Sequence, residues 1–182
     1  MRFREATGSD VDAMAATFEG RNSLPLEPRV RRELPRLLLQ LISSPACTLS
    51  VFEDDGPSGL RVVSLCGGLF LRDAFVERYL AAPHPGLVSA ALSALLDGER
   101  PLMTLEEIAI ANLGDGLVLG VLPIPLGHLA WSDPRAGELR QLAPKAFVSN
   151  VGGYRLRAIY YEVFDDEVAA YLQAGGYRLL HD

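Results

Sequence analysis

A nearly unbroken apolar run, Leu117 to Ile124 (LVLGVLPI), constrains the fold more than any other segment. Its length is that of a strand and falls far short of the ~20 residues that a membrane-spanning helix needs. Successive side chains of a strand point to opposite faces, so an apolar run is buried on both faces of its sheet. The run therefore predicts a central strand, with neighbours over 60–70 and 154–164 and helices on both faces.

The segments around this run alternate between strand and helix patterns. Ser9 with Asp12, and Thr104 with Glu107, have the spacing of a capping box at the N-terminus of a helix. Asp133 followed by Pro134 is typical of an N-cap with proline at the first helical position. The pattern predicts strands over 2–6, 48–53, 60–70, 117–124, 154–164 and 177–180, and helices over 9–20, 28–44, 73–80, 85–96, 104–111, 134–150 and 167–174.

The size and charge of the chain bound its function. A length of 182 residues fits one domain, 1–182, with a helical insertion over about 73–112. The formal net charge of −6 disfavours nucleic acid as a partner of this domain, because phosphate contacts need a basic patch. Two cysteines, no secretory leader and no spanning segment predict a cytoplasmic protein that does not enter the membrane.

Two segments at the ends of the chain resemble the acyl-CoA N-acyltransferase (GNAT) family. Phe3 to Met14 (FREATGSDVDAM) is similar to the family's opening strand and first helix. Val168 to Leu179 (VAAYLQAGGYRL) is similar to its closing helix, Gly-aromatic pair and last strand. The resemblance implies an α/β (α+β) fold with a mixed, mostly antiparallel sheet, and acetyl-CoA as the cofactor of an active member.

The loop that would bind the cofactor departs from the family pattern. Members hold the cofactor pyrophosphate with a Gly-rich loop after the central strand, whereas residues 125–135 (PLGHLAWSDPR) contain one glycine. Asp133 would place a carboxylate where the pyrophosphate lies, and Pro134 lacks an N–H donor. The residues of this loop that could still contact a cofactor are Gly127, His128, Trp131 and Arg135. We expect Trp131 to fill the wedge beside the central strand, with His128 packed over the same sheet end.

The family's general acid is also missing. Many members use a tyrosine in the last helix, at the position that Leu172 occupies here. Tyr171 is adjacent, but one residue along a helix turns the side chain by about 100°. Tyr171 is therefore predicted to be a core or interface aromatic, and it returns as a catalytic candidate only if the register shifts by one.

Glu162 is the second candidate for chemistry, because it lies within a strand that should be buried. A buried carboxylate must be paired or must face a cavity. It could pair with Arg155 or Arg157, or it could line a cleft and orient a cationic or amide ligand. No histidine has a second ligand at zinc-like spacing, so no metal site is expected.

A second resemblance extends over most of the chain. Residues 65–75 (LCGGLFLRDAF), 106–117 (EEIAIANLGDGL) and 152–157 (GGYRLR) are similar to the amino-terminal, GNAT-like portion of certain bacterial LuxR-type transcriptional regulators. It implies a non-catalytic sensing or dimerisation domain, a homodimer, an unidentified small-molecule ligand and no cofactor. In those proteins a helix-turn-helix follows the domain, and the present sequence stops at Asp182 before one. The alternative hypothesis is an acyl-CoA-dependent N-acetyltransferase with an atypical cofactor loop.

Overall fold

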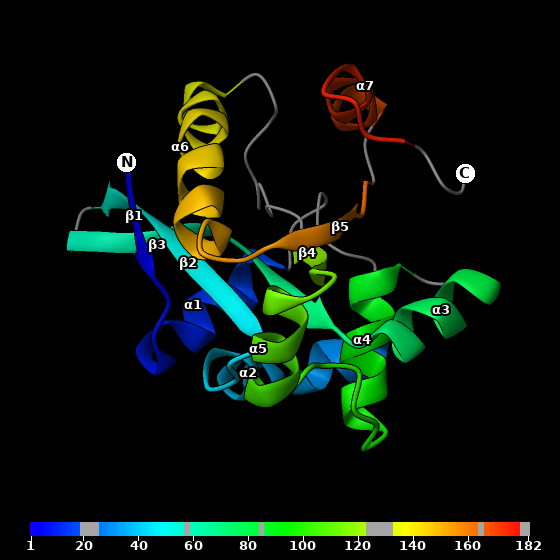
Figure 1. The fold of residues 1–182 in the computed structure, drawn as a ribbon. Helices are drawn as coiled ribbons and strands as arrows, with labels where there is room; N and C mark the ends of the chain where they lie inside the picture. The colour runs from blue at the N-terminus through cyan, green and yellow to red at the C-terminus, as the bar shows by residue number, and fades with distance from the viewer. Residues whose placement is uncertain (19–25, 57–58, 84–85, 123–132, 164–165, 179–182) are drawn as a thin grey trace.

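The computed structural model describes residues 1–18, 26–56, 59–83, 86–122, 133–163 and 166–178. Strands and helices are both distributed along the whole chain, which makes this an α/β (α+β) fold (Figure 1). In chain order they are β1 (Arg2–Glu5), the 3-10 helix η1 (Gly8–Asp10), α1 (Val11–Thr17), α2 (Pro28–Ile42), β2 (Cys47–Gly56), β3 (Gly59–Leu71), α3 (Asp73–Ala81), α4 (Leu87–Leu96), α5 (Leu105–Leu113), β4 (Leu117–Leu122), α6 (Pro134–Val151), β5 (Leu156–Tyr161) and α7 (Asp166–Ala174). None of the described helices is both long enough and apolar enough to span a membrane.

The five strands form one sheet in the order β1-β2-β3-β4-β5. The first three pairings are antiparallel, and β4 with β5 is parallel. This confirms the predicted mixed, mostly antiparallel sheet. The apolar run forms β4 between β3 and β5, as predicted, and every residue of β4 is buried. Residues 123 and 124 of the run lie outside the described residues.

Helices cover both faces of the sheet, because the side chains of β4 alternate between two apolar clusters. Val118 and Leu122 belong to a cluster with residues of α1, α2, α3 and α4. Leu117, Leu119 and Val121 face the opposite side, where Ile108 of α5 and the end of α6 pack. The rest of α6 lies over β1, β2 and β3 around Phe52 and Cys66 (Figure 1). The residues of the predicted helical insertion, about 73–112, form α3, α4 and α5, and these helices contribute to both faces.

The end of α7 differs from the sequence expectation of a strand over 177–180. Among the described residues, Tyr177 and Arg178 are not in a strand. The Tyr177 N–H donates to the Leu172 carbonyl at 3.1 Å, and the Gly176 N–H donates to the Gln173 carbonyl at 2.9 Å. With Gly176 at φ 91°, these bonds form a Schellman-type helix end. The Tyr177 amide is therefore used to close α7.

Candidate functional site

The carboxyl end of the parallel pair β4 and β5 is where an open α/β sheet would hold a ligand. The described pairing ends at Val121 opposite Tyr161, and Glu162 follows β5 directly. Tyr160 packs against the cluster that contains α4, so Glu162, two residues on, is on the same face. This register places a carboxylate against the insertion at the end of the sheet.

Glu162 closes the N-terminus of α4. Its Oε1 accepts a hydrogen bond from the Val88 N–H, and the Ser89 N–H also donates to the carboxylate. These amides belong to the first turn of α4, where helix N–H groups have no partner within the helix. Gly86 is the N-cap residue, and a Cβ there would overlap the Glu162 carboxyl group. A glycine is therefore required for the carboxylate to approach this helix end.

Of the two alternatives that the sequence left open for Glu162, the pairing with Arg155 or Arg157 does not occur among the described residues. The Arg157 guanidinium instead pairs with Asp73 of α3. The Arg155 backbone N–H donates to Asn112 Oδ1 at 2.5 Å, and no ion pair of its side chain occurs among the described residues. Glu162 is paired with main-chain N–H groups because its side of the sheet faces α4, whereas the arginines lie toward α3 and α5.

Burial raises the pKa of Glu162 to about 7, against the opposing effect of the Val88 and Ser89 N–H groups. Its Oε2 is buried and has no hydrogen-bond partner among the described residues. Burial is the main cause that raises the pKa of the nearby Tyr79 hydroxyl, and the Glu162 charge raises it further. A carboxyl group with a pKa near neutrality can exchange a proton at physiological pH.

The N-terminus of α6 holds a second carboxylate of the chain. Asp133 is the predicted N-cap, and its Oδ1 accepts from the Arg135 N–H at 2.9 Å. The Asp133 Oδ2 accepts from the Arg135 guanidinium, also at 2.9 Å. That guanidinium and the backbone bond hold the pKa of Asp133 below its usual range. Arg135, expected as a cofactor contact, is therefore paired within its own turn.

The structure does not describe the side chains of the other predicted site residues. Tyr171 lies in α7, and its side chain is not among the described atoms. Gly127, His128 and Trp131 lie outside the described residues, so the expected Trp131 plug stays a prediction. The three histidines, His84, His128 and His181, are all in this undescribed part.

Metal ligands and activated thiols do not gather in the described part of the chain. No group of three His, Cys, Asp or Glu residues is close enough there to hold a metal ion. Both cysteines are free thiols, and burial raises the pKa of Cys66 to about 12 and that of Cys47 further. Neither thiol is ionised near neutral pH, so neither is an activated nucleophile.

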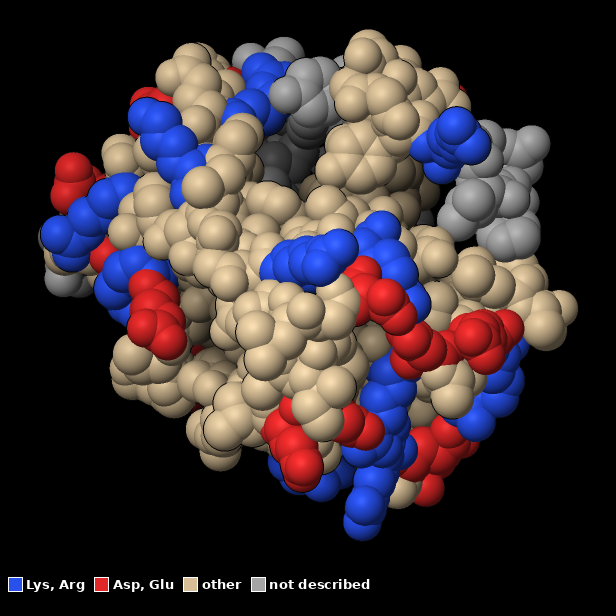
Figure 2. All heavy atoms as spheres, viewed as in Figure 1, with Lys and Arg blue, Asp and Glu red and all other residues tan. Residues whose placement is uncertain are grey.

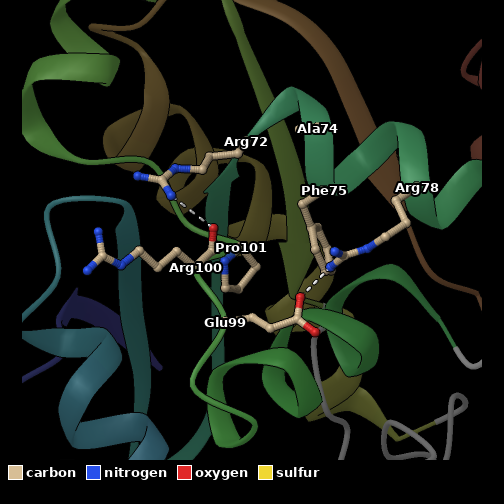
Figure 3. A pocket seen from close by; sticks show the side chains of 7 residues that line it. All are labelled: Arg72, Ala74, Phe75, Arg78, Glu99, Arg100 and Pro101. Atoms are coloured by element: carbon tan, nitrogen blue, oxygen red, sulfur yellow. Dashed lines mark hydrogen bonds and ion pairs between the residues drawn. The ribbon is translucent and has the colours of Figure 1, made fainter.

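An open pocket of about 420 Å³ lies between α3 and the segment that joins α4 to α5, and no sequence pattern indicated it. Two links bring these parts together: Leu71 bridges Leu102, and the Arg72 N–H donates to the Pro101 carbonyl at 2.9 Å. No spacing pattern shows this juxtaposition, because Arg72 and Arg100 are 28 residues apart. The lining is three arginines, one carboxylate and apolar groups: Arg72, Ala74, Phe75, Arg78, Glu99, Arg100 and Pro101 (Figure 3).

The three guanidinium groups of this pocket differ in how they are held. Arg78 pairs with Glu99 and lies over the Phe75 ring, 5.6 Å from its centroid. Arg72 donates to Glu107 at 2.9 Å and to the Arg100 carbonyl at 3.3 Å. Arg100 is exposed and has no ion pair among the described residues, and in Figure 3 its side chain extends to the same side as that of Arg72. Arg100 is thus the guanidinium that a ligand could use without breaking an ion pair.

Comparison with known proteins identifies the fold and goes no further. No protein-family model matches the chain, and no curated protein sequence matches it. Among solved structures, a point mutant of the BH1408 protein from Bacillus halodurans is similar, with a TM-score of 0.54 and 14% identity. A tetramutant of the same protein gives a TM-score of 0.50 and 12% identity. Each comparison covers 100% of this chain and 96% of the other.

Proposed function

We propose that this chain is a non-catalytic GNAT-like sensing and dimerisation domain, related to the amino-terminal portion of LuxR-type regulators. One observation supports the non-catalytic assignment above the others. The chain's own carboxylate Asp133 occupies the N-terminus of α6, which follows the expected cofactor loop, and Glu162 occupies the N-terminus of α4. The free thiols of Cys47 and Cys66 support a reducing, cytoplasmic location.

The physical reason is competition for the same donors and the same positive potential. A pyrophosphate binds at a helix N-terminus through free N–H groups and the positive end of the helix dipole. At α6, Asp133 already accepts from the Arg135 N–H and guanidinium, and Pro134 has no N–H. A bound pyrophosphate would have to displace this carboxylate or lie beside a like charge.

The sensing part of the proposal rests on the arginine-lined pocket. Its volume lies within the ~300–1,000 Å³ of small-molecule sites. Arg100 offers a guanidinium that has no ion pair among the described residues, and Phe75 and Pro101 add apolar surface to other parts of the lining. Such a lining selects a small organic anion, a carboxylate or a phosphate ester, rather than a cation.

Calorimetry with acetyl-CoA tests the non-catalytic assignment. We expect a dissociation constant weaker than about 1 mM, which is a binding free energy of less than about 4 kcal/mol. Micromolar binding would reject the assignment and favour the acyltransferase.

Thermal shift with a panel of small carboxylates and phosphate esters tests the sensing site. A ligand at a hundredfold its dissociation constant should stabilise the protein by about 2.7 kcal/mol. Arg100→Ala should remove this shift. Arg32→Ala, which changes an exposed arginine of α2, is the matched control and should keep it.

The alternative function, an acyl-CoA-dependent N-acetyltransferase, is favoured by one feature, the Glu162 pKa of about 7. A carboxylate with that pKa suits a general base that removes a proton from an amine. Its engagement by the Val88 and Ser89 N–H groups argues against this role, since a base must reach its substrate. Acetyl transfer from acetyl-CoA to an amine panel, abolished by Glu162→Gln, would establish it.

A further inference from the structure

The segment 99–101 forms one wall of the arginine-lined pocket, and its backbone is fixed at both ends. At the end of α4, Gly98 has a φ of 77°. The Gly98 N–H donates to the Leu95 carbonyl at 3.2 Å, and the Glu99 N–H donates to the Ala94 carbonyl at 2.9 Å. These are the two bonds of a Schellman motif. The other end of the segment is hydrogen-bonded to the start of α3. This wall is therefore in place before a ligand arrives.

The charges of the lining leave one guanidinium in excess. Arg72 is paired with Glu107 and Arg78 with Glu99, whereas Arg100 has no ion pair among the described residues. Displacement of Glu99 from its partner would leave two guanidinium groups of the pocket without an ion pair. The lining thus matches one negative charge as it stands and two negative charges once Glu99 has moved away.

The two guanidinium groups concerned are separate in the pocket. In Figure 3 the side chains of Arg100 and Arg78 lie on opposite sides of Pro101, which also lines the pocket. A ligand that reaches both must therefore carry its charges at two ends. A phosphate ester places both charges on one group, whereas a dicarboxylate separates them along an apolar chain. The carboxylate also has the geometry that Arg78 already accepts from Glu99.

The ion pair between Arg78 and Glu99 is open to exchange. The Arg78 side chain is 64% exposed and that of Glu99 is 46% exposed. Exposed ion pairs stabilise a protein little, because both groups are well hydrated when they separate. The Phe75 ring, with its centroid 5.6 Å from the Arg78 guanidinium, supports that guanidinium independently of Glu99. Figure 2 shows basic and acidic side chains interspersed over α3 and the segment after α4, at the lower right of the view.

We propose that the pocket binds a linear dicarboxylate, with one carboxylate on Arg100 and the other on Arg78 in the place of Glu99. This inference rests on the sensing site of the proposed function and names its ligand class. Glu99 is then an internal competitor that occupies Arg78 while the ligand is absent. On binding, the Glu99 carboxylate returns to water, and the two guanidinium groups balance the charge of the dianion.

Calorimetry with the full chain at constant ionic strength tests the ligand class. The probes are succinate, glutarate and adipate, each compared with its monoamide, which keeps the length and removes one charge. The best dicarboxylate should bind about threefold more tightly than its monoamide, or better, because it forms a second ion pair. Inorganic phosphate should bind no more tightly than the monoamides. Monoamides that bind as tightly as the dicarboxylates overturn the proposal, and so does a lack of binding by all three dicarboxylates.

Variants at exposed positions test the role of Glu99. Glu99→Gln removes the competitor and should tighten the best dicarboxylate by about two- to sixfold, the factor by which an exposed pair occupies Arg78. Arg78→Gln should weaken this dicarboxylate to within about twofold of its monoamide. Arg32→Gln, which changes an exposed arginine of α2, is the matched control and should leave binding unchanged. Circular dichroism of each variant checks that the fold is kept.

The double variant Arg78→Gln with Glu99→Gln separates competition from general repulsion. Without Arg78 there is no guanidinium to compete for, so the added Glu99→Gln should change the affinity by less than about twofold. A larger gain in the double variant would show that Glu99 only repels anions, and would overturn its role as a competitor. Dicarboxylates and monoamides that bind alike, and are both lost in Arg100→Ala, would overturn the dicarboxylate and keep the sensing site. The acetyl-CoA result is independent of all these outcomes.

Discussion

The helices α4 and α5 follow one another in the chain and are similar in length, and both are rich in apolar residues, but their burial differs. In α4, seven of ten residues are buried, whereas in α5 only Ile108 is. The difference arises from position, because α4 packs against α2, α3 and β4, whereas α5 packs one side on β4. Composition shows how much apolar surface a helix carries, and the neighbouring elements decide how much is covered.

The largest change in the free energy of unfolding is expected at the buried helix, α4. Leu92 of α4 is 2% exposed and belongs to the largest apolar cluster. Leu92→Ala should lower the free energy of unfolding by about 2–5 kcal/mol, through lost transfer energy and the cavity left behind. Urea unfolding followed by circular dichroism measures the loss. A loss below about 1 kcal/mol would mean that α4 is not a core helix.

The second effect concerns the carboxylate at the start of α4. Because burial raises the pKa of Glu162 to about 7 from the usual 4.5, the folded chain binds more protons than the unfolded chain between these values. The contribution of Glu162 is therefore present below pH 4.5 and is lost as the pH rises through 7. The free energy of unfolding should fall by about 2–3 kcal/mol from pH 5 to pH 8.

Glu162→Gln isolates this contribution, because the amide oxygen can still accept from the Val88 N–H and no longer titrates. The variant should lose the decrease between pH 5 and pH 8. The three histidines are common to both proteins, so the difference between the two pH profiles reports Glu162 alone. Parallel profiles would show that the Glu162 carboxyl has an ordinary pKa.

Much of the fold could be predicted from local patterns. The run 117–124 predicted β4 because a strand that is buried on both faces must be apolar throughout. The box of Thr104 and Glu107 predicted the start of α5, where the Thr104 Oγ1 accepts from the Glu107 N–H. Asp133 was predicted as the N-cap of α6 for the same local reason.

The site around Glu162 depends on contacts between segments that are distant in the sequence. Local sequence patterns do not predict such contacts. Glu162 reaches the first turn of α4 across 74 residues, and the absence of a Cβ at Gly86 permits the approach. From the sequence, an arginine partner and a position lining a cleft were both open for Glu162, because a buried carboxylate needs either a partner or a cavity. The exposed face of α5 was also missed, since an apolar helix has the same pattern whether its outer side is covered or not.

The smallest change in the free energy of unfolding is expected at the exposed side of α5. Leu113→Ala makes the same change as Leu92→Ala, but at 87% exposure it leaves no cavity, so the unfolding free energy at low concentration should change by less than about 0.5 kcal/mol. A loss above about 1 kcal/mol in urea unfolding at this concentration would instead show that the single chain already covers the outer side of α5.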